Sequence, residues 1–431
     1  MVRGPVVRVG PNQLDFAGSK GYDDIMNKPY PKDREYYGVL SKPNSDAVTT
    51  TCDPRDASKR RVTIGAYFSR QAVFRLEHVI QQKVIQHRTP FMAYGFILIY
   101  LQVDTLIHRI SSYAKSKRPV DLTYAFRAAS LDIITSYLFA QDSNALNYPD
   151  FRHPMILGTE QILENVWVPK YIPIRWDKFP EWIVRRLIPA AVPVLDQQDY
   201  LGRRLEELVQ SSNTSEDQVP AIFDIFLHKD PGTGEKAWTI PRSRLLDECL
   251  NLQVAGTDTT SNACMIGTHY LLRDRRLLVG LQRELDEVWP VRDSPIHFEK
   301  LEKLPYLTGV IKESLRLSHG VVDPLPRIIN RPGATIMGIP VPVGTTASSS
   351  ACFAHTDPSA FFEPTEFRPE RWLDPVSSRD SEKHLVAFSK GPRTCLGVKS
   401  VILSMNPSVY DLQAQNSLAW CELYLKAMAD R

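Results

Sequence analysis

The sequence predicts a mostly α-helical fold with a small β part. From about residue 69 to residue 320, apolar residues recur at spacings of three and four and the runs stop at Pro and Gly, which is typical of successive helices. Strand patterns are few: Val6 to Val9 is a short β-like run, and Gly10-Pro11 ends it as a turn. From Pro324 to Pro375 prolines are so frequent that we expect short strands and an ordered meander instead of helix.

Length and composition fit a single large globular unit. A chain of 431 residues that is 43% hydrophobic can bury a large core, so we expect one domain over residues 1–431. The formal net charge of +3 is small against 52 basic and 49 acidic residues, which argues against nucleic acid as a partner. Six scattered cysteines without a C-x-x-C pair argue against zinc and against a secreted disulfide framework.

The chain shows no secretory signal and no run of eighteen apolar residues. Its most apolar window, residues 91–101, is too short to span a bilayer. We therefore expect a soluble chain whose thiols are reduced and face the cytosol.

The sharpest chemical signal is Phe388-Ser-Lys-Gly391-Pro-Arg393-Thr-Cys395-Leu-Gly397. A thiolate that binds iron needs a lowered pKa and shelter from water, and N–H groups of a glycine-rich loop followed by a helix N-terminus provide both. Arg393 is placed to meet an anionic haem propionate, and Phe388 can pack under the ring. The alternative for Cys395 is a buried free thiol, the ordinary state of an isolated cysteine.

This segment resembles the F-x-x-G-x-R-x-C-x-G signature of the cytochrome P-450 family, and further family motifs follow in order over nearly the whole chain. The resemblance implies the cytochrome P-450 fold and a haem b cofactor with Cys395 as its axial iron ligand. It places Phe388, Gly391, Arg393 and Gly397 in the cofactor site. It also implies dioxygen as co-substrate and electrons from an NADPH-dependent reductase.

Ala255-Gly256-Thr257-Asp258-Thr259-Thr260 lies in a helical stretch that begins near Arg244. It resembles the family motif A/G-G-x-D/E-T-T on the distal side of the haem. Reductive cleavage of dioxygen needs two protons, so Thr259 is the expected hydroxyl and Asp258 the expected relay acid. Ala255 and Gly256 leave room for dioxygen. Without Cys395, such a glycine is more often a helix kink or a cap.

Glu313-Ser-Leu-Arg316 resembles the family's E-x-x-R motif, and Arg371 follows in Phe367-Arg-Pro-Glu-Arg371-Trp. An acid and a base three residues apart are usually a solvated pair on a helix. The apolar residues around this pair instead favour the family's buried ion-pair network of Glu313, Arg316 and Arg371. We expect this network to be structural and not catalytic.

Two further arginines resemble family contacts to the haem propionates. Arg61 matches the arginine of a family helix, but the aromatic or histidine expected four residues earlier is Ala57, so one haem hydrogen bond is expected to be missing. Arg327, in Pro324-Leu-Pro-Arg327, resembles the third propionate contact. An exposed surface arginine is the alternative for each.

Two segments interrupt continuous patterns. Removing residues 84–102 joins Lys83 to Val103 and restores an amphipathic helix, and removing residues 398–415 restores the helix expected directly after Gly397. Both segments begin with Val and end with Gln, whose codons can carry intron boundaries. We interpret both as translated introns, with tolerated loop insertions as the alternative. Transcript reads that span both segments in frame would contradict this interpretation.

The ends of the chain also depart from the family. The resemblance predicts a membrane anchor and a first helix before Val6, and further strands after Arg431. We expect the domain to be incomplete at both ends. The resemblance implies association with the endoplasmic reticulum membrane, which is usual in the family, and we expect this chain to face the cytoplasm without an anchor or signal of its own.

These observations predict a haem-thiolate monooxygenase that inserts one atom of dioxygen into a small hydrophobic substrate. Residues 122–138 and 318–327 resemble fungal secondary-metabolite enzymes of the trichodiene oxygenase type, which implies a terpenoid or polyketide-like substrate and a role of the mycotoxin-biosynthesis kind. Two alternatives remain open: a haem-thiolate isomerase or dehydratase, which needs no electrons, and a haem-free remnant without enzymatic activity.

Overall fold

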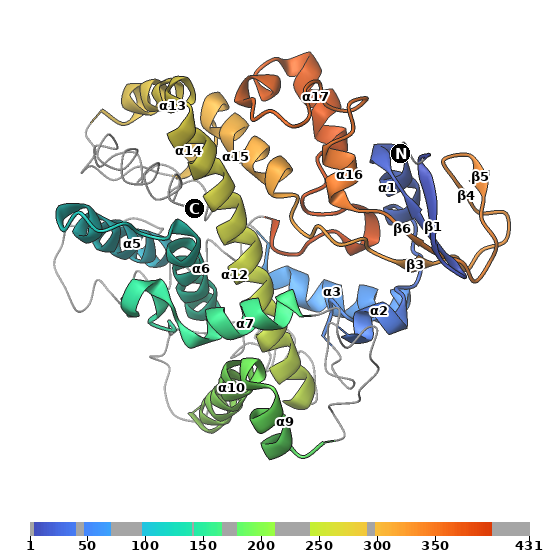
Figure 1. The fold of residues 1–431 in the computed structure, drawn as a ribbon, viewed down its shortest axis with the longest axis horizontal. Helices are drawn as coiled ribbons and strands as arrows, with labels where there is room; N and C mark the ends of the chain where they lie inside the picture. Colours follow the sequence, from blue (N-terminus) through green and yellow to red (C-terminus); the bar gives the residue numbers. More distant parts are fainter. Residues whose placement is uncertain are drawn as a thin grey trace, which may run out of the picture.

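A long helix runs through the middle of the molecule, and the other elements pack around it (Figure 1). The computed structural model describes residues 4–39, 47–69, 97–139, 142–165, 179–211, 242–290 and 298–398. The central helix is α12 (Arg242–Arg273), which begins two residues before the predicted start. It packs against α6 (Leu122–Phe139) on one side and α15 (Pro305–Ser318) on the other. The mostly helical class predicted from the sequence is confirmed.

The remaining helices surround this centre. The helices are α1 (Gly18–Met26), α2 (Arg34–Val39), α3 (Pro54–Tyr67), α5 (Ile97–Lys115), α7 (Pro154–Glu164), α9 (Glu181–Leu187), α10 (Val192–Ser211), α13 (Arg275–Val288), α14 (Phe298–Leu301), α16 (Ala351–His355) and α17 (Pro375–His384). Short 3-10 turns are η1 (Ala145–Asn147), η2 (Pro149–Phe151), η4 (Pro189–Ala191), η5 (Pro369–Trp372) and η6 (Gly391–Arg393). None of the described helices is both long and apolar enough to cross a membrane.

The small β part lies at one edge of the molecule (Figure 1). Its larger sheet has the order β1-β2-β6-β3, from β1 (Val6–Gly10), β2 (Gln13–Phe16), β6 (Thr346–Ser348) and β3 (Arg327–Ile328). Strands β2 and β6 are parallel, and the other neighbours are antiparallel. The hairpin β4 (Thr335–Ile336) and β5 (Ile339–Pro340) is separate. The strand predicted at Val6 to Val9 is β1.

The proline-rich segment departs from the prediction at one place. A short helix, α16, lies within it, although only strands and meander were expected. The reason is local: no proline occurs between Pro342 and Pro358. Ser350 begins the helix, since its side chain accepts a hydrogen bond from the Cys352 N–H at 3.1 Å.

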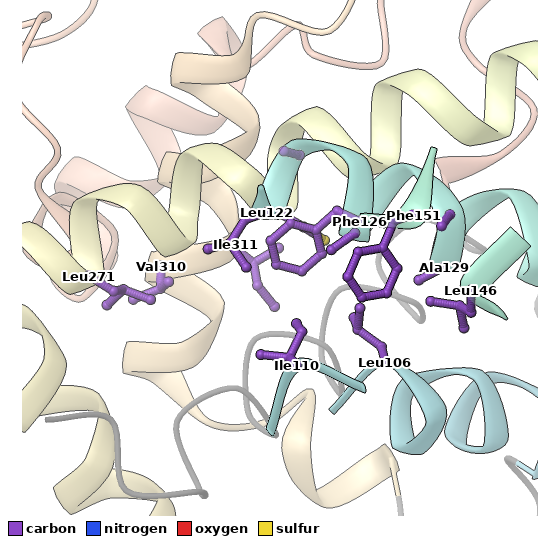
Figure 2. Packing of buried hydrophobic residues seen from close by; sticks show 14 of the residues in the cluster. Leu106, Ile110, Leu122, Phe126, Ala129, Leu146, Phe151, Leu271, Val310 and Ile311 are labelled. Atoms are coloured by element: carbon purple, nitrogen blue, oxygen red, sulfur yellow. The ribbon is translucent and has the colours of Figure 1, made fainter. Parts of the chain in front are cut away.

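The main core joins α5, α6, α12 and α15 (Figure 2). Leu106 and Ile110 of α5 contact the buried face of α6, where Phe126 is only 2% exposed. Burying each such side chain stabilises the fold by roughly 1.5–3 kcal/mol before entropy is counted. Most residues of α6 are buried, because the helix packs between α5 and α12. It forms one wall of the site described below.

The two suspected inserts lie mostly outside the described residues. Residues 84–96 and 399–415 belong to parts of the chain that the structure does not describe, as does Lys83, to which the repaired helix joins Val103. Residues 97–102 form the first turns of α5. Val103, Leu106 and Ile110, which follow the first suspected insert, are all buried on α5.

Candidate functional site

Cys395 lies in a tight loop that its own backbone closes. The Cys395 N–H donates to the Phe388 carbonyl at 2.8 Å, and the Thr394 N–H donates to the Gly391 carbonyl at 3.1 Å. Gly391 has a φ of +67°, and a Cβ there would lie 2.3 Å from the Met26 carbonyl oxygen. Only glycine fits this contact, so Gly391 lets the loop pack directly on the end of α1.

Residues from the beginning of the chain also hold this loop. The Lys390 ammonium lies 2.5 Å from the Asp23 carboxylate, and the Tyr22 hydroxyl donates to Ser389 at 3.1 Å. The Arg61 guanidinium, on α3, donates to the carbonyl of Thr394, the residue before the cysteine. The position of Cys395 is therefore set by α1 and α3 as well as by its own loop.

Cys395 faces a cavity between its loop and α12. Helix α6 forms a further wall, and α3 with Phe68 after it and the segments around Lys32 and Val48 also contribute lining residues. Most of the lining is apolar. The lining residues are Lys32, Val48, Thr49, Arg61, Phe68, Ser130, Ile133, Ile134, Tyr137, Asn251, Leu252, Ala255, Gly256, Thr259, Thr260, Arg393, Cys395, Leu396 and Gly397.

The lowered pKa expected for Cys395 is that of an iron-bound thiolate and stays a prediction. In the free thiol, desolvation raises the pKa, although the side chain is exposed to the cavity. Two contacts oppose that effect: the Gly397 N–H, which donates to Sγ at 3.3 Å, and the charge of Arg61. Desolvation of the thiolate outweighs them, because an unbalanced anion in an apolar wall is costly. A cation bound at Sγ would supply the missing balance.

Thr259 and Asp258, adjacent on α12, point to different surroundings. Thr259 lines the cavity, and its hydroxyl donates to the Ala255 carbonyl at 2.7 Å, which leaves its oxygen lone pairs available as acceptors. Asp258 does not line this cavity. Its Oδ1 lies 3.0 Å from Nε of Arg127 on α6, and its Oδ2 is buried without a hydrogen-bond partner among the described residues. Burial raises the pKa of Asp258, against the attraction of Arg127.

Ala255 and Gly256 also line the cavity, but Gly256 has a second role that was not predicted. A Cβ at this position would lie 2.9 Å from Cγ1 of Ile134 on α6. The glycine therefore allows close packing of α12 on α6, in addition to leaving space in the cavity.

Four cations gather at one side of the cavity. Lys32, Arg61 and Arg393 line it, and Arg327 lies beside them as the backbone partner of Lys32. Arg393 donates to the carbonyls of Cys52 and Asp53 at 3.2 and 3.1 Å, and Arg327 donates to the Tyr37 hydroxyl at 2.8 Å. Within the described part of the chain, no carboxylate forms an ion pair with any of the four.

These residues fit a haem. Nη1 of Arg393 is buried and has no hydrogen-bond partner within the described ranges. Burial, together with the charges of Arg327 and Arg61, lowers the pKa of Arg393 to about 10. The two carboxylates of a haem would neutralise this cluster of cations. The apolar faces of its ring would match the cavity walls, and its iron would match Sγ as a ligand.

Phe388 is not among the cavity residues. It packs partly buried against the main core, and the predicted contact under the ring stays a prediction. Leu396, on the other side of the cysteine, lines the cavity instead.

Glu313, Arg316 and Arg371 lie in one buried network. Glu313 and Arg316 are fully buried on α15, and Nε and Nη2 of Arg316 donate to the two Glu313 oxygens at 2.9 and 2.7 Å. Arg371 donates to Oε1 of Glu313 at 3.0 Å, and the Trp372 indole donates to Oε2 at 3.0 Å. The network ties α15 to η5, away from the cavity.

All five N–H donors of Arg316 are used. Besides the two bonds to Glu313, its guanidinium donates to the carbonyls of His355, Pro364 and Glu366. Glu313 also accepts from the Arg368 N–H at 2.9 Å. Full satisfaction is the condition under which a buried ion pair is tolerated.

Sequence reasoning missed Lys32 and the walls supplied by α6 and by the segment around Val48. Lys32 stands in Pro31-Lys-Asp33, where no pattern marks it as buried. The apolar residues of α6 predicted only a buried helix. Such a pattern does not distinguish a helix that lines a cavity from a helix that packs in the core.

The arrangement is that of a haem-thiolate enzyme: an apolar cavity with a thiol on one wall, a helix with a hydroxyl on another, and cations at one side. Comparison with known proteins agrees. The family model "Cytochrome P-450" matches residues 96–402, and the chain belongs to the cytochrome P-450 family.

Named relatives are fungal cytochrome P-450 monooxygenases. The chain is 32% identical over 400 residues to the monooxygenase aflU of Aspergillus parasiticus, covering 92% of this chain and 75% of the relative. It is 28% identical over 409 residues to the monooxygenase TRI4 of Fusarium sporotrichioides, covering 93% and 74%. A crystal structure of another cytochrome P-450 superposes with a TM-score of 0.71 at 21% identity, covering 93% of this chain and 82% of that one, which shows the fold.

The chain is thus an oxidoreductase of the monooxygenase type, and its family implies haem iron, dioxygen and an external source of electrons. Members of the family generally receive those electrons from a redox partner and act on hydrophobic substrates.

Proposed function

We propose that the protein binds haem b through Cys395 and inserts one atom of dioxygen into a small hydrophobic substrate, with electrons that a reductase takes from NADPH. The observation that carries the proposal is the common cavity of Cys395 and Thr259, with Lys32, Arg61 and Arg393 at its side. Bound haem supplies the activation of dioxygen. The residues of this chain hold the cofactor, exclude water and move protons.

Each set of residues has a separate task in this proposal. Sγ of Cys395 ligates the iron, and Arg61, Arg327 and Arg393 hold the haem carboxylates. The glycines at positions 256, 391 and 397 permit close approach of backbone, and Ala255 keeps the cavity open next to them. Glu313, Arg316 and Arg371 hold α15 against η5 and have a structural role.

Proton delivery is assigned to Thr259 and Asp258. The Thr259 oxygen can accept a hydrogen bond inside the cavity while its own proton is held by the Ala255 carbonyl. Asp258, on the side of α12 away from the cavity, has a pKa raised by burial and an oxygen without a hydrogen-bond partner among the described residues, which suits an acid that passes a proton on. The Arg127 contact keeps this carboxyl from turning freely.

The substrate is assigned by the walls of the cavity. Ile133, Ile134 and Tyr137 of α6, and Phe68 directly after α3, present apolar surface. Ser130 and Asn251 add a few polar atoms. Such a lining selects a small hydrophobic molecule with few polar groups. Because the named relatives are fungal monooxygenases, we propose a terpenoid or polyketide-like compound of secondary metabolism.

Two measurements test the proposal. The reduced, carbon monoxide-treated protein should show the Soret shift of a thiolate-ligated haem, and Cys395→Ser should lose it. Product formation from candidate terpenoids should require NADPH and a reductase and should incorporate label from ¹⁸O₂. Turnover without electrons would favour an isomerase or dehydratase, and absence of haem in the purified protein would favour a remnant without this activity.

A further inference from the structure

Lys32 occupies a position that an unpaired lysine rarely holds. It is 9% exposed, and its backbone forms an antiparallel bridge with Arg327. The Ile328 N–H donates to the Pro31 carbonyl at 2.8 Å, which extends this pairing. Residues directly opposite in such a bridge have their side chains on the same face, about 5 Å apart at Cβ. Two basic side chains therefore lie side by side at the cavity.

The contacts of Lys32 do not neutralise its charge. Its ammonium donates to the Thr49 carbonyl and lies 4.2 Å from the centre of the Tyr37 ring. No ion pair joins it to an acid within the described residues. Burial, and next the charges of Arg327 and Arg393, hold the pKa of Lys32 well below its usual value. Like charges paired across strands destabilise the fold unless an anion lies between them.

An anion bound at these cations would receive no hydrogen bond from the side chain of Ala57. On α3, Ala57 and Arg61 are four residues apart and so lie on the same side of the helix. Ala57 is fully buried and has no polar side-chain atom. Arg61 reaches the cavity, but the position one turn before it offers nothing to an anion.

We infer that Lys32 is the fourth cationic contact of the haem carboxylates and replaces the donor that Ala57 does not provide. This inference rests on the proposed haem binding and adds a residue from the segment before α2 to the contacts from α3, β3 and the cysteine loop. Lys32 is a cofactor-positioning residue and takes no part in the transfer of oxygen.

The test compares haem with haem dimethyl ester, which lacks the carboxylates. Apoprotein of the wild-type chain, of Lys32→Met and of Lys59→Met is reconstituted with each compound, and the rate of loss to excess apomyoglobin is measured. Lys59 is exposed on α3 and serves as the matched control. We expect Lys32→Met to lose haem about tenfold faster or more, because a charge-assisted hydrogen bond is removed. Lys59→Met should match the wild-type rate.

With the dimethyl ester, Lys32→Met and the wild-type chain should lose the compound at equal rates. A tenfold difference that persists with the ester would overturn the inference, since Lys32 would then act through packing. Equal rates with haem itself would overturn it as well. If wild-type apoprotein takes up neither compound, the proposed function and this inference are both contradicted. The other two outcomes contradict the inference alone.

The stability of the apoproteins in urea is a second measurement, and a structural role of Lys32 would change it in the opposite direction. Unfolding of the apoproteins in urea should need more denaturant for Lys32→Met than for the wild-type chain, because a buried unneutralised amine is removed. If Lys32 served mainly to anchor the Thr49 carbonyl, the same variant would unfold at less denaturant, and the inference would be wrong.

Discussion

Oδ1 of Asp258 lies 3.0 Å from Nε of Arg127, so this acid, which stands between the cavity-lining residues Gly256 and Thr259 of α12, is tied to α6 and not to the cavity. Arg127 also lies 2.8 Å from Glu160 on α7. The carboxyl of Asp258 is thus held on the side of α12 away from the cavity, one residue from Thr259.

Asp258→Asn should slow product formation roughly 10- to 100-fold, because an amide cannot supply protons. The haem spectrum should stay that of the wild-type chain, since the side chain does not line the cavity. Product formation rates, with and without deuterated solvent, measure the effect. A variant with wild-type turnover would remove Asp258 from the proton path.

Thr259→Val keeps the shape of the side chain and removes its hydroxyl. We expect a smaller fraction of NADPH-derived electrons to reach product and more to leave as hydrogen peroxide. Thr257→Val is the matched control, because Thr257 makes the same type of bond, to the Gln253 carbonyl at 2.7 Å, but does not line the cavity. The two variants are compared by product formed per NADPH consumed. Equal coupling in both would contradict the role of Thr259.

Glu313→Gln should destabilise the protein by about 3–5 kcal/mol, because the buried Arg316 and Arg371 lose their shared counter-charge. Denaturant unfolding of the haem-loaded protein measures this loss. Glu363→Gln breaks an exposed pair with Arg368 and should cost less than about 1 kcal/mol. Similar costs for the two variants would show that burial of the network contributes little.

Gly391→Ala should lower the fraction of protein that binds haem. Its Cβ would enter the space of the Met26 carbonyl oxygen, and the positive φ adds strain. Gly333→Ala separates the two effects, because Gly333 has a φ of +72° but its Cβ would meet no atom within 4 Å. The control should cost about 1–2 kcal/mol and keep its haem. Haem content per protein and unfolding midpoints are the measurements.

Stability should fall with acidification through His355. This ring is fully buried, accepts a hydrogen bond from the Val386 N–H at 2.8 Å, and has its pKa lowered by burial to about 3. In the unfolded chain a histidine takes up its proton near pH 6.5. The contribution is therefore complete above pH 6.5 and declines below it, by up to about 1.4 kcal/mol per pH unit, until about pH 3.

His355→Gln should flatten the dependence of unfolding free energy on pH between about 6 and 4. The neighbouring His319, whose pKa burial also lowers, keeps part of the slope. His108→Gln, at an exposed position of α5, should retain the wild-type slope. A slope unchanged in His355→Gln would show that this ring does not govern acid stability.

Motifs contained in short stretches could be matched to the family, and with them Arg371 as the distant partner of Glu313. Spacing alone favoured a solvated pair for Glu313 and Arg316, whereas the resemblance to the family predicted the buried network that the structure shows. The neighbours Lys32 and Arg327, and Asp258 and Arg127, meet only because strands and helices pair across the fold. Periodicity carries no information about such pairings.

The contacts that hold the cysteine loop also fix an order of events during synthesis. Lys390 bonds a carboxylate 367 residues earlier in the chain, and Arg61 bonds a carbonyl 333 residues later. Contacts of such separation are among the last to form. Helices α1 and α3 leave the ribosome long before the residues of the cysteine loop that they contact. The position of the thiol is consequently completed only after nearly the whole described chain has been made, so we expect haem binding to come late in folding.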